Sequence, residues 1–163
     1  MSTRIDYAAK LRTPFAVLGV RTDGQAVTGL DFLPHGEHEQ APADAVAARA
    51  VRELERYLDD PGFRFTVPLA PHGTPFRQRV WDALFTIEPG QSRTYGEVAR
   101  MVRSAPRAVG QACGSNPIAL IIPCHRVVGA MGAIGGFMHS ESDSPLAIKR
   151  WLLTHEGYRF GLC

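Results

Sequence analysis

Residues 118–128 read Ile-Ala-Leu-Ile-Ile-Pro-Cys-His-Arg-Val-Val. The continuous apolar run Ile118–Ile122 predicts a buried, extended segment. Cys124 and His125 follow it closely, so we expect a thiol and an imidazole to emerge together from the core at a turn. Only the thiolate is a good nucleophile, and a neighbouring proton acceptor would activate a thiol of ordinary pKa. This stretch therefore indicates nucleophilic chemistry at Cys124.

Neighbouring side chains on an extended backbone point to opposite sides. We therefore expect His125 to reach Cys124 through a bridging water molecule. A carboxylate on the far side of the imidazole would fix its tautomer, and Glu156 is the candidate. A cysteine beside an apolar run is also commonly a packing residue, and this segment alone leaves that alternative open.

Helix signals surround this stretch. Thr74 can cap a helix that starts at Pro75 and stops at Pro89-Gly90. The pattern Thr94-Tyr95-Gly96-Glu97 is a capping box and predicts a helix from Tyr95 to about Val102. A last helix is expected from Ser144-Pro145 to His155.

A turn at Ser104–Pro106 precedes a third predicted helix, Arg107–Gly114, which ends before Asn116-Pro117. Two short helices across a tight turn are the outline of a helix-turn-helix. Alanine and glycine at alternate positions let the backbone of the third helix approach a partner closely, although each glycine costs about 1 kcal/mol of helix stability. These positions are Ala108, Gly110, Ala112 and Gly114.

The first half of the chain predicts a different lobe. Phe15–Val20 and Ala26–Leu33 are partly alternating apolar runs joined by Thr22-Asp23-Gly24, which is typical of a β-hairpin. Asp44–Tyr57 has helical periodicity and should lie on the sheet. Phe63–Leu69 predicts a further strand.

Prolines and a glycine around residue 72 indicate a linker. The sequence therefore predicts an α/β protein in two parts: an N-terminal α/β lobe over residues 1–72 and a mostly helical domain over residues 73–163.

The composition is that of a globular protein, with 45% hydrophobic and 21% charged residues among 163. The net charge of +2 means that a nucleic acid would have to meet a local basic patch. Met1–Arg12 lacks an apolar signal region and no stretch has the length of a membrane span, so we expect a soluble, cytoplasmic protein. Three cysteines, an odd number, argue against a disulfide framework.

Histidines and one glutamate in the first half do not match the spacing of a metal-ligand set, so no catalytic metal and no cofactor are expected. The residues are His35, Glu37, His38 and His72.

The second half resembles the O6-alkylguanine-DNA alkyltransferases, whose active-site signature Pro-Cys-His-Arg-Val-Val is complete at Pro123–Val128. Further matching motifs occur in the same order as in that family: Gly73-Thr74-Pro75-Phe76, Val80-Trp81, Tyr95-Gly96-Glu97-Val98-Ala99, Arg107-Ala108-Val109-Gly110, Asn116-Pro117, Leu152-Leu153 and Glu156-Gly157.

The resemblance implies irreversible, stoichiometric repair of O6-alkylguanine, and also of O4-alkylthymine, in double-stranded DNA. It makes Cys124 the alkyl acceptor, His125 its water-mediated base and Glu156 the orienting carboxylate. Asn116 becomes a hinge between recognition helix and active site. A ribonuclease H-like first lobe and a monomeric protein without a cofactor are expected.

The family binds the minor groove and flips the target base out of the stack, which agrees with the small residues Ala108, Gly110 and Ala112. By resemblance, Arg107 fills the gap left by the base. Tyr95 rotates the phosphate and donates a proton toward guanine N3.

The alkyl pocket also follows from the resemblance. The backbone near Val127 and Val128 should read the exocyclic amine, and Cys113 and Phe137 should line the pocket.

The sequence departs from the family in two places. The helix-turn-helix is about two residues shorter, so its turn should be tighter. A polar loop, Met138–Pro145, replaces the glycine pair expected after Phe137.

Three other functions remain in view. A non-catalytic binder of alkylated DNA would lack Cys124. A cysteine hydrolase would turn over esters or amides without DNA. A transcription regulator would carry polar, base-reading side chains on its recognition helix.

Overall fold

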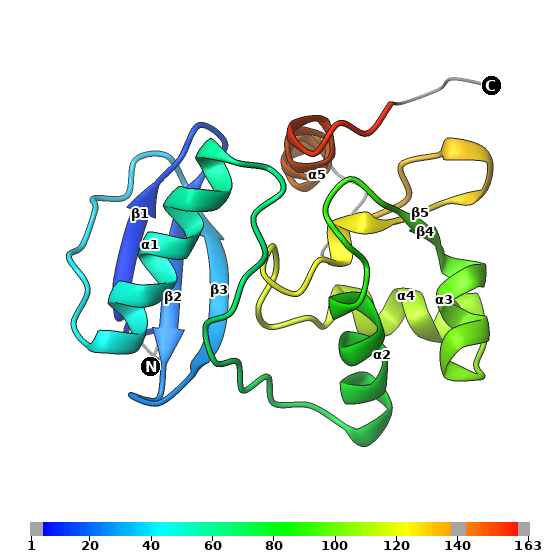
Figure 1. The fold of residues 1–163 in the computed structure, drawn as a ribbon, viewed down its shortest axis with the longest axis horizontal. Coiled ribbons are helices and arrows are strands. Elements are labelled where there is room, and N and C mark those ends of the chain that lie inside the picture. The colour runs from blue at the N-terminus through cyan, green and yellow to red at the C-terminus, as the bar shows by residue number, and fades with distance from the viewer. Residues whose placement is uncertain (1–4, 138–142, 160–163) are drawn as a thin grey trace.

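The first lobe is a small sheet with one helix packed on it (Figure 1). A computed structural model describes residues 5–137 and 143–159 of the chain. The sheet has three antiparallel strands in the order β1-β2-β3. They are β1 (Ala9–Arg12), β2 (Val17–Thr22) and β3 (Val27–Leu33).

The predicted hairpin is confirmed, since β2 and β3 pair across it. Asp23 Oδ1 accepts hydrogen bonds from the N–H groups of Gln25 and Ala26 at 2.8 Å each. Gly24 has a φ of +89°, a conformation that glycine adopts without steric cost. Strand β1 was not predicted, because its four residues, Ala-Lys-Leu-Arg, are too few to show an alternating apolar pattern.

Helix α1 (Ala45–Asp59) confirms the predicted helix and covers one face of the sheet (Figure 1). Asp44 caps it, because its side chain accepts a hydrogen bond from Ala47 N at 2.7 Å. The residues on its inner side are buried, among them Ala47, Ala50, Leu54 and Tyr57.

The strand predicted at Phe63–Leu69 is wrong, because this segment is irregular apart from a bridge between Leu69 and Val27. The carboxylate of Glu53 on α1 takes the place of a strand partner. Its Oε1 accepts hydrogen bonds from Thr66 N at 2.8 Å and Val67 N at 3.0 Å. A side chain thus satisfies backbone donors that a neighbouring strand would otherwise satisfy.

The second part of the chain is mainly helical, as predicted. The capping box at Thr94 and Glu97 is present with both of its hydrogen bonds. A two-stranded parallel sheet joins β4 to β5. The elements are α2 (Pro75–Phe85), β4 (Arg93–Thr94), α3 (Tyr95–Val102), α4 (Pro106–Gly114), β5 (Val127–Val128) and α5 (Asp143–His155).

The apolar run Ile118–Ile122 is buried as predicted, but it is not extended. It turns at Leu120, which has a φ of +75°. Asn116 holds this loop on both sides: its Oδ1 accepts from Ile118 N at 3.0 Å and its Nδ2 donates to the Ile122 carbonyl at 2.8 Å. Two side-chain hydrogen bonds therefore make a compact loop out of a sequence that reads as a strand.

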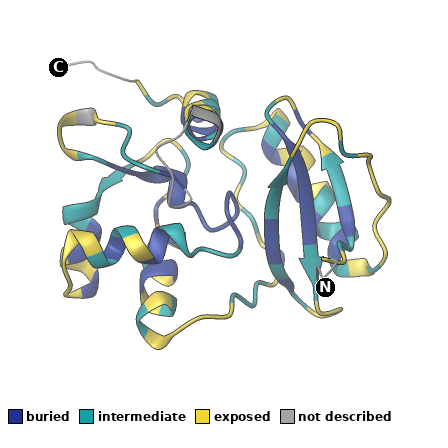
Figure 2. Ribbon diagram, turned by 180° about the vertical axis from the view of Figure 1, so that it is seen from behind, coloured by how far each residue is buried: buried dark blue, intermediate teal, exposed yellow. Residues whose placement is uncertain are grey.

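This loop also joins the two parts of the molecule. Leu30 of β3 donates a backbone hydrogen bond to the Pro117 carbonyl at 2.9 Å. Figure 2 shows buried positions concentrated on the inward faces of both parts. The division near residue 72 and the ribonuclease H-like relationship stay predictions.

Among residues 5–137 and 143–159, no helix combines the length and the apolar character needed to cross a membrane. Most of the polar loop Met138–Pro145, and Cys163, lie outside the described residues.

Candidate active site

Cys124 begins a short 3-10 turn, Cys124–Arg126, directly after the buried loop. Its side chain is nearly inaccessible, with the residue 4% exposed. Burial raises the pKa of the thiol, while a hydrogen bond with the Asn116 side chain and the charge of Lys149 oppose that rise. The thiol therefore holds its proton at neutral pH and needs an acceptor to react.

His125 is fully buried, and its Nε2 lies 2.8 Å from Glu156 Oε2. Arg126 holds the same carboxylate from the other side, with Nε 2.7 Å from Oε1 and Nη2 3.1 Å from Oε2. Burial alone would raise the pKa of Glu156, but His125 and Arg126 together hold it well below its ordinary value. The ion pair with the Arg126 guanidinium keeps Glu156 ionised even while His125 is neutral.

An ionised carboxylate only accepts hydrogen bonds, so the proton of the neutral imidazole lies on Nε2. Burial lowers the pKa of His125, and the neighbouring Glu156 offsets only part of this effect. Nδ1 has no hydrogen-bond partner among the described residues. The imidazole is thus held neutral with a free acceptor nitrogen, as a base requires.

Tyr95 and Cys113 lie close enough to Cys124 to interact with it electrostatically. Burial raises the pKa of Tyr95, so its hydroxyl stays protonated and can donate. Burial likewise raises the pKa of Cys113, which keeps it a neutral thiol. Gly135 leaves room for Tyr95, since a Cβ there would come within 2.9 Å of Tyr95 Cε2.

The remaining expected pocket residues are buried: Val127, Val128 and Phe137 are 0%, 4% and 4% exposed. Phe137 also packs against Phe32 of β3, with ring centroids 5.8 Å apart. The sheet lobe therefore helps to hold Phe137, one of the expected pocket residues, in place.

Lys149 on α5 was missed at the sequence level. It is fully buried, and its Nζ donates to the carbonyls of Val127 and Gly136 at 2.8 Å each. Its ammonium also lies 5.9 Å from the centre of the Tyr95 ring. Burial lowers the pKa of Lys149 to about 8. The spacing of apolar residues on the last helix places this lysine on its buried face, which is the signal that could have found it.

Lys149→Met should lower the free energy of unfolding by about 1–3 kcal/mol, because two buried carbonyls lose their donor. Wild type should gain stability relative to this variant as the pH rises from about 8 toward 10.5, since the folded state then no longer holds a buried charge. Urea unfolding of both proteins measures this. Lys10→Met, which removes a surface pair with Glu37, is the control and should change stability by less than about 1 kcal/mol. Equal effects of the two changes would contradict the assignment.

The expected DNA face is divided by the structure. Arg107 is exposed, and Ala108 and Gly110 are half-buried. A Cβ on Gly110 would meet nothing within 4 Å, so this position is open. Ala112 is 1% exposed and its carbonyl accepts from Trp81 Nε1 at 2.9 Å. Ala112 thus lies on the inner side of α4 and is left out of the surface proposed below.

The turn between α3 and α4 is tight, as the short spacing predicts. Arg103 ends α3 in the left-handed conformation, with a φ of 55°. Arg79 of α2 donates to the Val102 carbonyl at 2.8 Å and so holds the end of α3.

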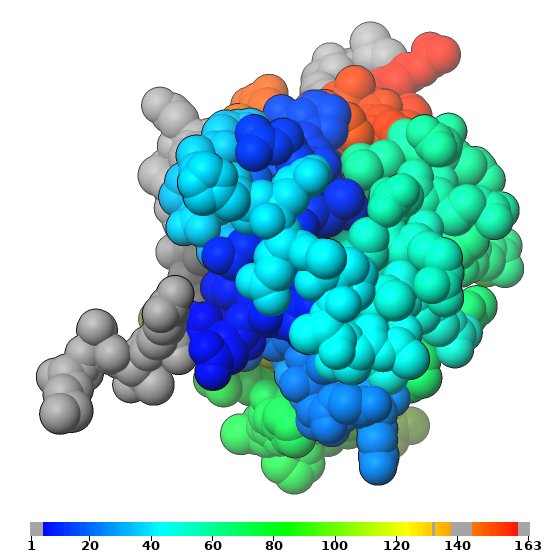
Figure 3. Space-filling view, turned by 90° about the vertical axis from the view of Figure 1, so that its left-hand side faces the viewer, coloured from blue at the N-terminus to red at the C-terminus, as the bar shows by residue number. Residues whose placement is uncertain are grey.

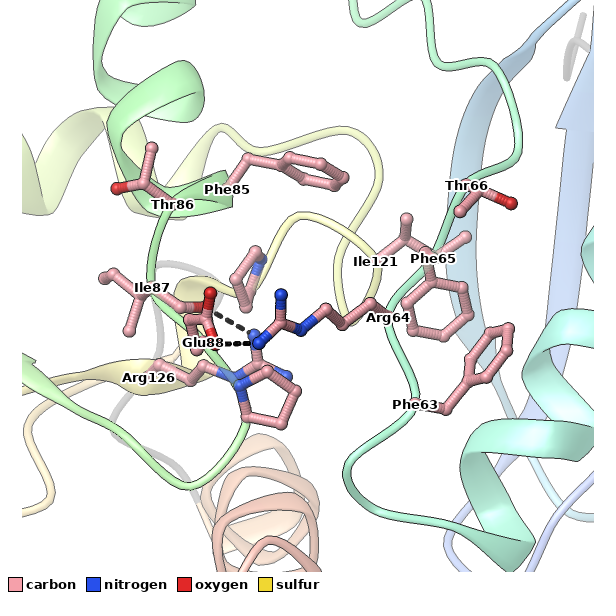
Figure 4. Close-up of a pocket in the computed structure, with 12 residues that line it drawn as sticks. Phe63, Arg64, Phe65, Thr66, Phe85, Thr86, Ile87, Glu88, Ile121 and Arg126 are labelled. Carbon is pink, nitrogen blue, oxygen red and sulfur yellow. Dashed lines mark hydrogen bonds and ion pairs between the residues drawn. The ribbon is translucent and has the colours of Figure 1, made fainter.

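A pocket of about 460 Å³ lies where residues 63–66 face the end of α2 (Figure 4). Phe63, Phe65 and Phe85 contribute its aromatic surface. An ion pair between Arg64 and Glu88 crosses it. Arg126 also lines this pocket and donates to the Ile87 carbonyl at 2.7 Å. Because Arg126 also pairs with Glu156, it separates the pocket from the histidine–carboxylate pair.

In the described part of the chain, His, Cys, Asp and Glu side chains do not gather in groups of three or more that would hold a metal ion. The structure thus places a buried thiol next to a histidine that pairs with a buried carboxylate, in a domain that also presents two short, closely packed helices.

Comparisons with known proteins agree with this class. Residues 75–158 match the family model described as 6-O-methylguanine DNA methyltransferase, DNA binding domain. A methylated-DNA–protein-cysteine methyltransferase of Methanosarcina acetivorans is 38% identical over 93% of this chain and 98% of its own. One from Mycobacterium leprae is 47% identical over 80% and 83%. The structure of Mycobacterium tuberculosis OGT in complex with DNA superposes with a TM-score of 0.76, at 37% identity and 90% coverage of both chains.

The chain belongs to the methylated-DNA–protein-cysteine methyltransferase family. Its activity is accordingly DNA repair by transfer of an alkyl group from DNA to protein.

Proposed function

We propose that the protein repairs O6-alkylguanine, and also O4-alkylthymine, in double-stranded DNA by transferring the alkyl group to Cys124. The observation that carries this assignment is the buried thiol followed directly by a neutral histidine held by Glu156 and Arg126. In the reaction the Cys124 sulfur forms a bond to the alkyl carbon, and the bond from that carbon to guanine O6 breaks. The product is a thioether, a very poor leaving group, so each molecule acts once.

The thiol proton goes to His125 Nδ1 through a bridging water. Two observations support this route: Nε2 already donates to Glu156, and Nδ1 has no partner among the described residues. Asn116 supports the thiolate through its hydrogen bond. It also holds both sides of the loop that precedes Cys124, which fits a hinge role.

The departing guanine needs a proton, and Tyr95 donates it toward N3. Two observations support this role: burial keeps the Tyr95 hydroxyl protonated, and Tyr95 interacts electrostatically with Cys124. Backbone groups at Val127 and Val128 read the exocyclic amine, and Cys113 and Phe137 complete the alkyl pocket.

Helices α3 and α4 form a helix-turn-helix that enters the minor groove. The open side of Gly110 and the small side chain of Ala108 allow the close approach that a narrow groove demands. Arg107 lies exposed in the first turn of α4 and fills the gap when the damaged nucleotide flips out.

Arg107→Ala should slow transfer on duplex DNA far more than on free O6-benzylguanine, because a free base needs no extrusion. Single-turnover rates at saturating concentrations of each substrate measure this difference. Arg100→Ala, which removes an equal charge from the exposed side of α3, is the matched control. This variant should bind DNA more weakly, and its affinity should depend less on salt, but its transfer rate at saturating DNA should equal that of wild type. Equal saturated rates for wild type and Arg107→Ala on duplex would rule out the gap-filling role.

A further inference from the structure

Helix α1 of the sheet lobe reaches the carboxylate that serves the reactive histidine. The Tyr57 hydroxyl donates a hydrogen bond of 2.6 Å to Glu156 Oε2, across 99 residues of sequence. Tyr57 lies outside residues 75–158, the part of the chain that matches the family's DNA-binding domain. A group from the other lobe therefore contacts the active-site relay directly.

The hydrogen bonds to Glu156 leave its carboxylate little freedom. Oε2 accepts hydrogen bonds from His125 Nε2 at 2.8 Å, from the Tyr57 hydroxyl at 2.6 Å and from Arg126 Nη2 at 3.1 Å. Oε1 receives Arg126 Nε at 2.7 Å. Tyr57 and His125 share one oxygen, so the tyrosine influences both the direction and the charge of the acceptor that the imidazole uses.

Tyr57 is itself held in place. Its carbonyl oxygen accepts a hydrogen bond from His155 Nε2 at 2.7 Å, and its ring meets the His155 ring edge-on at 5.1 Å. The Phe65 ring packs at 5.7 Å on the tyrosine. The helix that carries Tyr57 is thus anchored to the residue immediately before Glu156.

Solvent does not reach this contact. Tyr57 is 0% exposed and Glu156 is 9% exposed. Figure 3 shows the molecule from the side of the sheet lobe. Residues from β1 to α1, coloured blue to cyan, cover most of this side, and α5, in orange, lies at the upper edge. Burial, and then the negative charge of Glu156, raise the pKa of Tyr57, so the hydroxyl remains a donor throughout the working pH range.

We propose that Tyr57 is a positioning residue for alkyl transfer: its hydroxyl fixes the Glu156 carboxylate and, through it, the orientation and basicity of His125. The sheet lobe is then a working part of the active site as well as a packing partner. This inference rests on the proposed function, because it assumes that His125 accepts the thiol proton.

Tyr57→Phe is the direct test, since phenylalanine keeps the ring packing and removes only the donor. Loss of a hydrogen bond to a charged group should slow transfer about tenfold. The loss should be equal on duplex DNA and on free O6-benzylguanine, because the relay acts after the base is in place. The matched control is Tyr7→Phe, which removes a 2.9 Å hydrogen bond to Asp31 in the same lobe, and it should keep the wild-type rate.

A second readout separates positioning from packing. Without the tyrosine donor, Glu156 becomes a stronger acceptor, so the His125 pKa should rise and its Nε2 proton resonance should move downfield. The acidic limb of the rate profile should then shift to higher pH. The charged groups that act on His125 are Glu156, Arg126 and Lys149, with His155 beyond Tyr57. Placing 3-fluorotyrosine at position 57 gives a stronger donor in an unchanged fold and should shift the His125 pKa in the opposite direction.

The outcomes are distinguishable. Wild type that leaves no alkyl group on Cys124 would refute the proposed function. If wild type transfers while Tyr57→Phe reacts at the wild-type rate with an unchanged His125 resonance, the positioning role is wrong. A rate loss matched by Tyr7→Phe, or a His125 pKa that is the same with fluorotyrosine as with tyrosine, would reduce the contact to packing.

Discussion

Incubation with an oligonucleotide carrying one O6-methylguanine should add a single methyl group to Cys124, and the reaction should then stop. Cys124→Ala should abolish transfer altogether, because it removes the attacking sulfur, while DNA binding persists since the thiol is buried. Mass spectrometry of the intact protein and of its peptides measures the mark and its position.

Cys113→Ala is the matched control, because Cys113 is a second buried thiol and interacts electrostatically with Cys124. This variant should still accept one methyl group on Cys124. Methyl groups found on Cys113 or Cys163 would overturn the assignment. Many turnovers per protein molecule would instead favour the cysteine hydrolase, in which water releases the acyl group from the sulfur and restores the thiol after each cycle.

His125→Ala and Glu156→Gln should slow transfer by about 10²–10⁴-fold, the usual contribution of general acid–base help. The alanine removes the proton acceptor. The glutamine removes the negative charge that raises the His125 pKa, so the imidazole becomes a weaker base and the apparent thiol pKa rises. Both variants should therefore recover part of their rate at higher pH.

Single-turnover transfer to each variant across the pH range tests this relay. Glu156→Gln leaves the buried charge of Arg126 without its counter-ion, so the free energy of unfolding should fall by about 3–5 kcal/mol. Circular dichroism checks that this variant still folds. His125→Ala keeps that ion pair and separates the loss of the base from the loss of stability. Wild-type rates for both variants at every pH would show that Cys124 is activated in another way.

Helices were predictable where local chemistry marks their ends. The threonine caps of α2 and α3 form the hydrogen bonds that their sequence patterns imply. The hairpin turn at Asp23-Gly24 is equally local. Such elements are decided within a few residues, so their sequence signals survive in the folded protein.

Two segments were misjudged because a side chain outside each segment decides its conformation. Phe63–Leu69 has a strand-like composition, but Glu53 of α1 satisfies its backbone donors. Ile118–Ile122 has the apolar content of a buried strand, but the Asn116 side chain closes it into a loop. In both cases a side chain outside the segment makes the deciding hydrogen bonds. The spacing of apolar residues along the sequence does not reveal such a pairing.

The sequence by itself determined that a thiol and an imidazole adjoin one another after an apolar run, and their residue types predict a nucleophile and a base. Only the tertiary structure decided what surrounds that pair. Glu156, Lys149 and Tyr57 come from distant positions and lie buried around Cys124 and His125. Burial there raises the thiol pKa, lowers the imidazole pKa and strengthens each hydrogen bond to the carboxylate, and burial is a property of the packed chain as a whole.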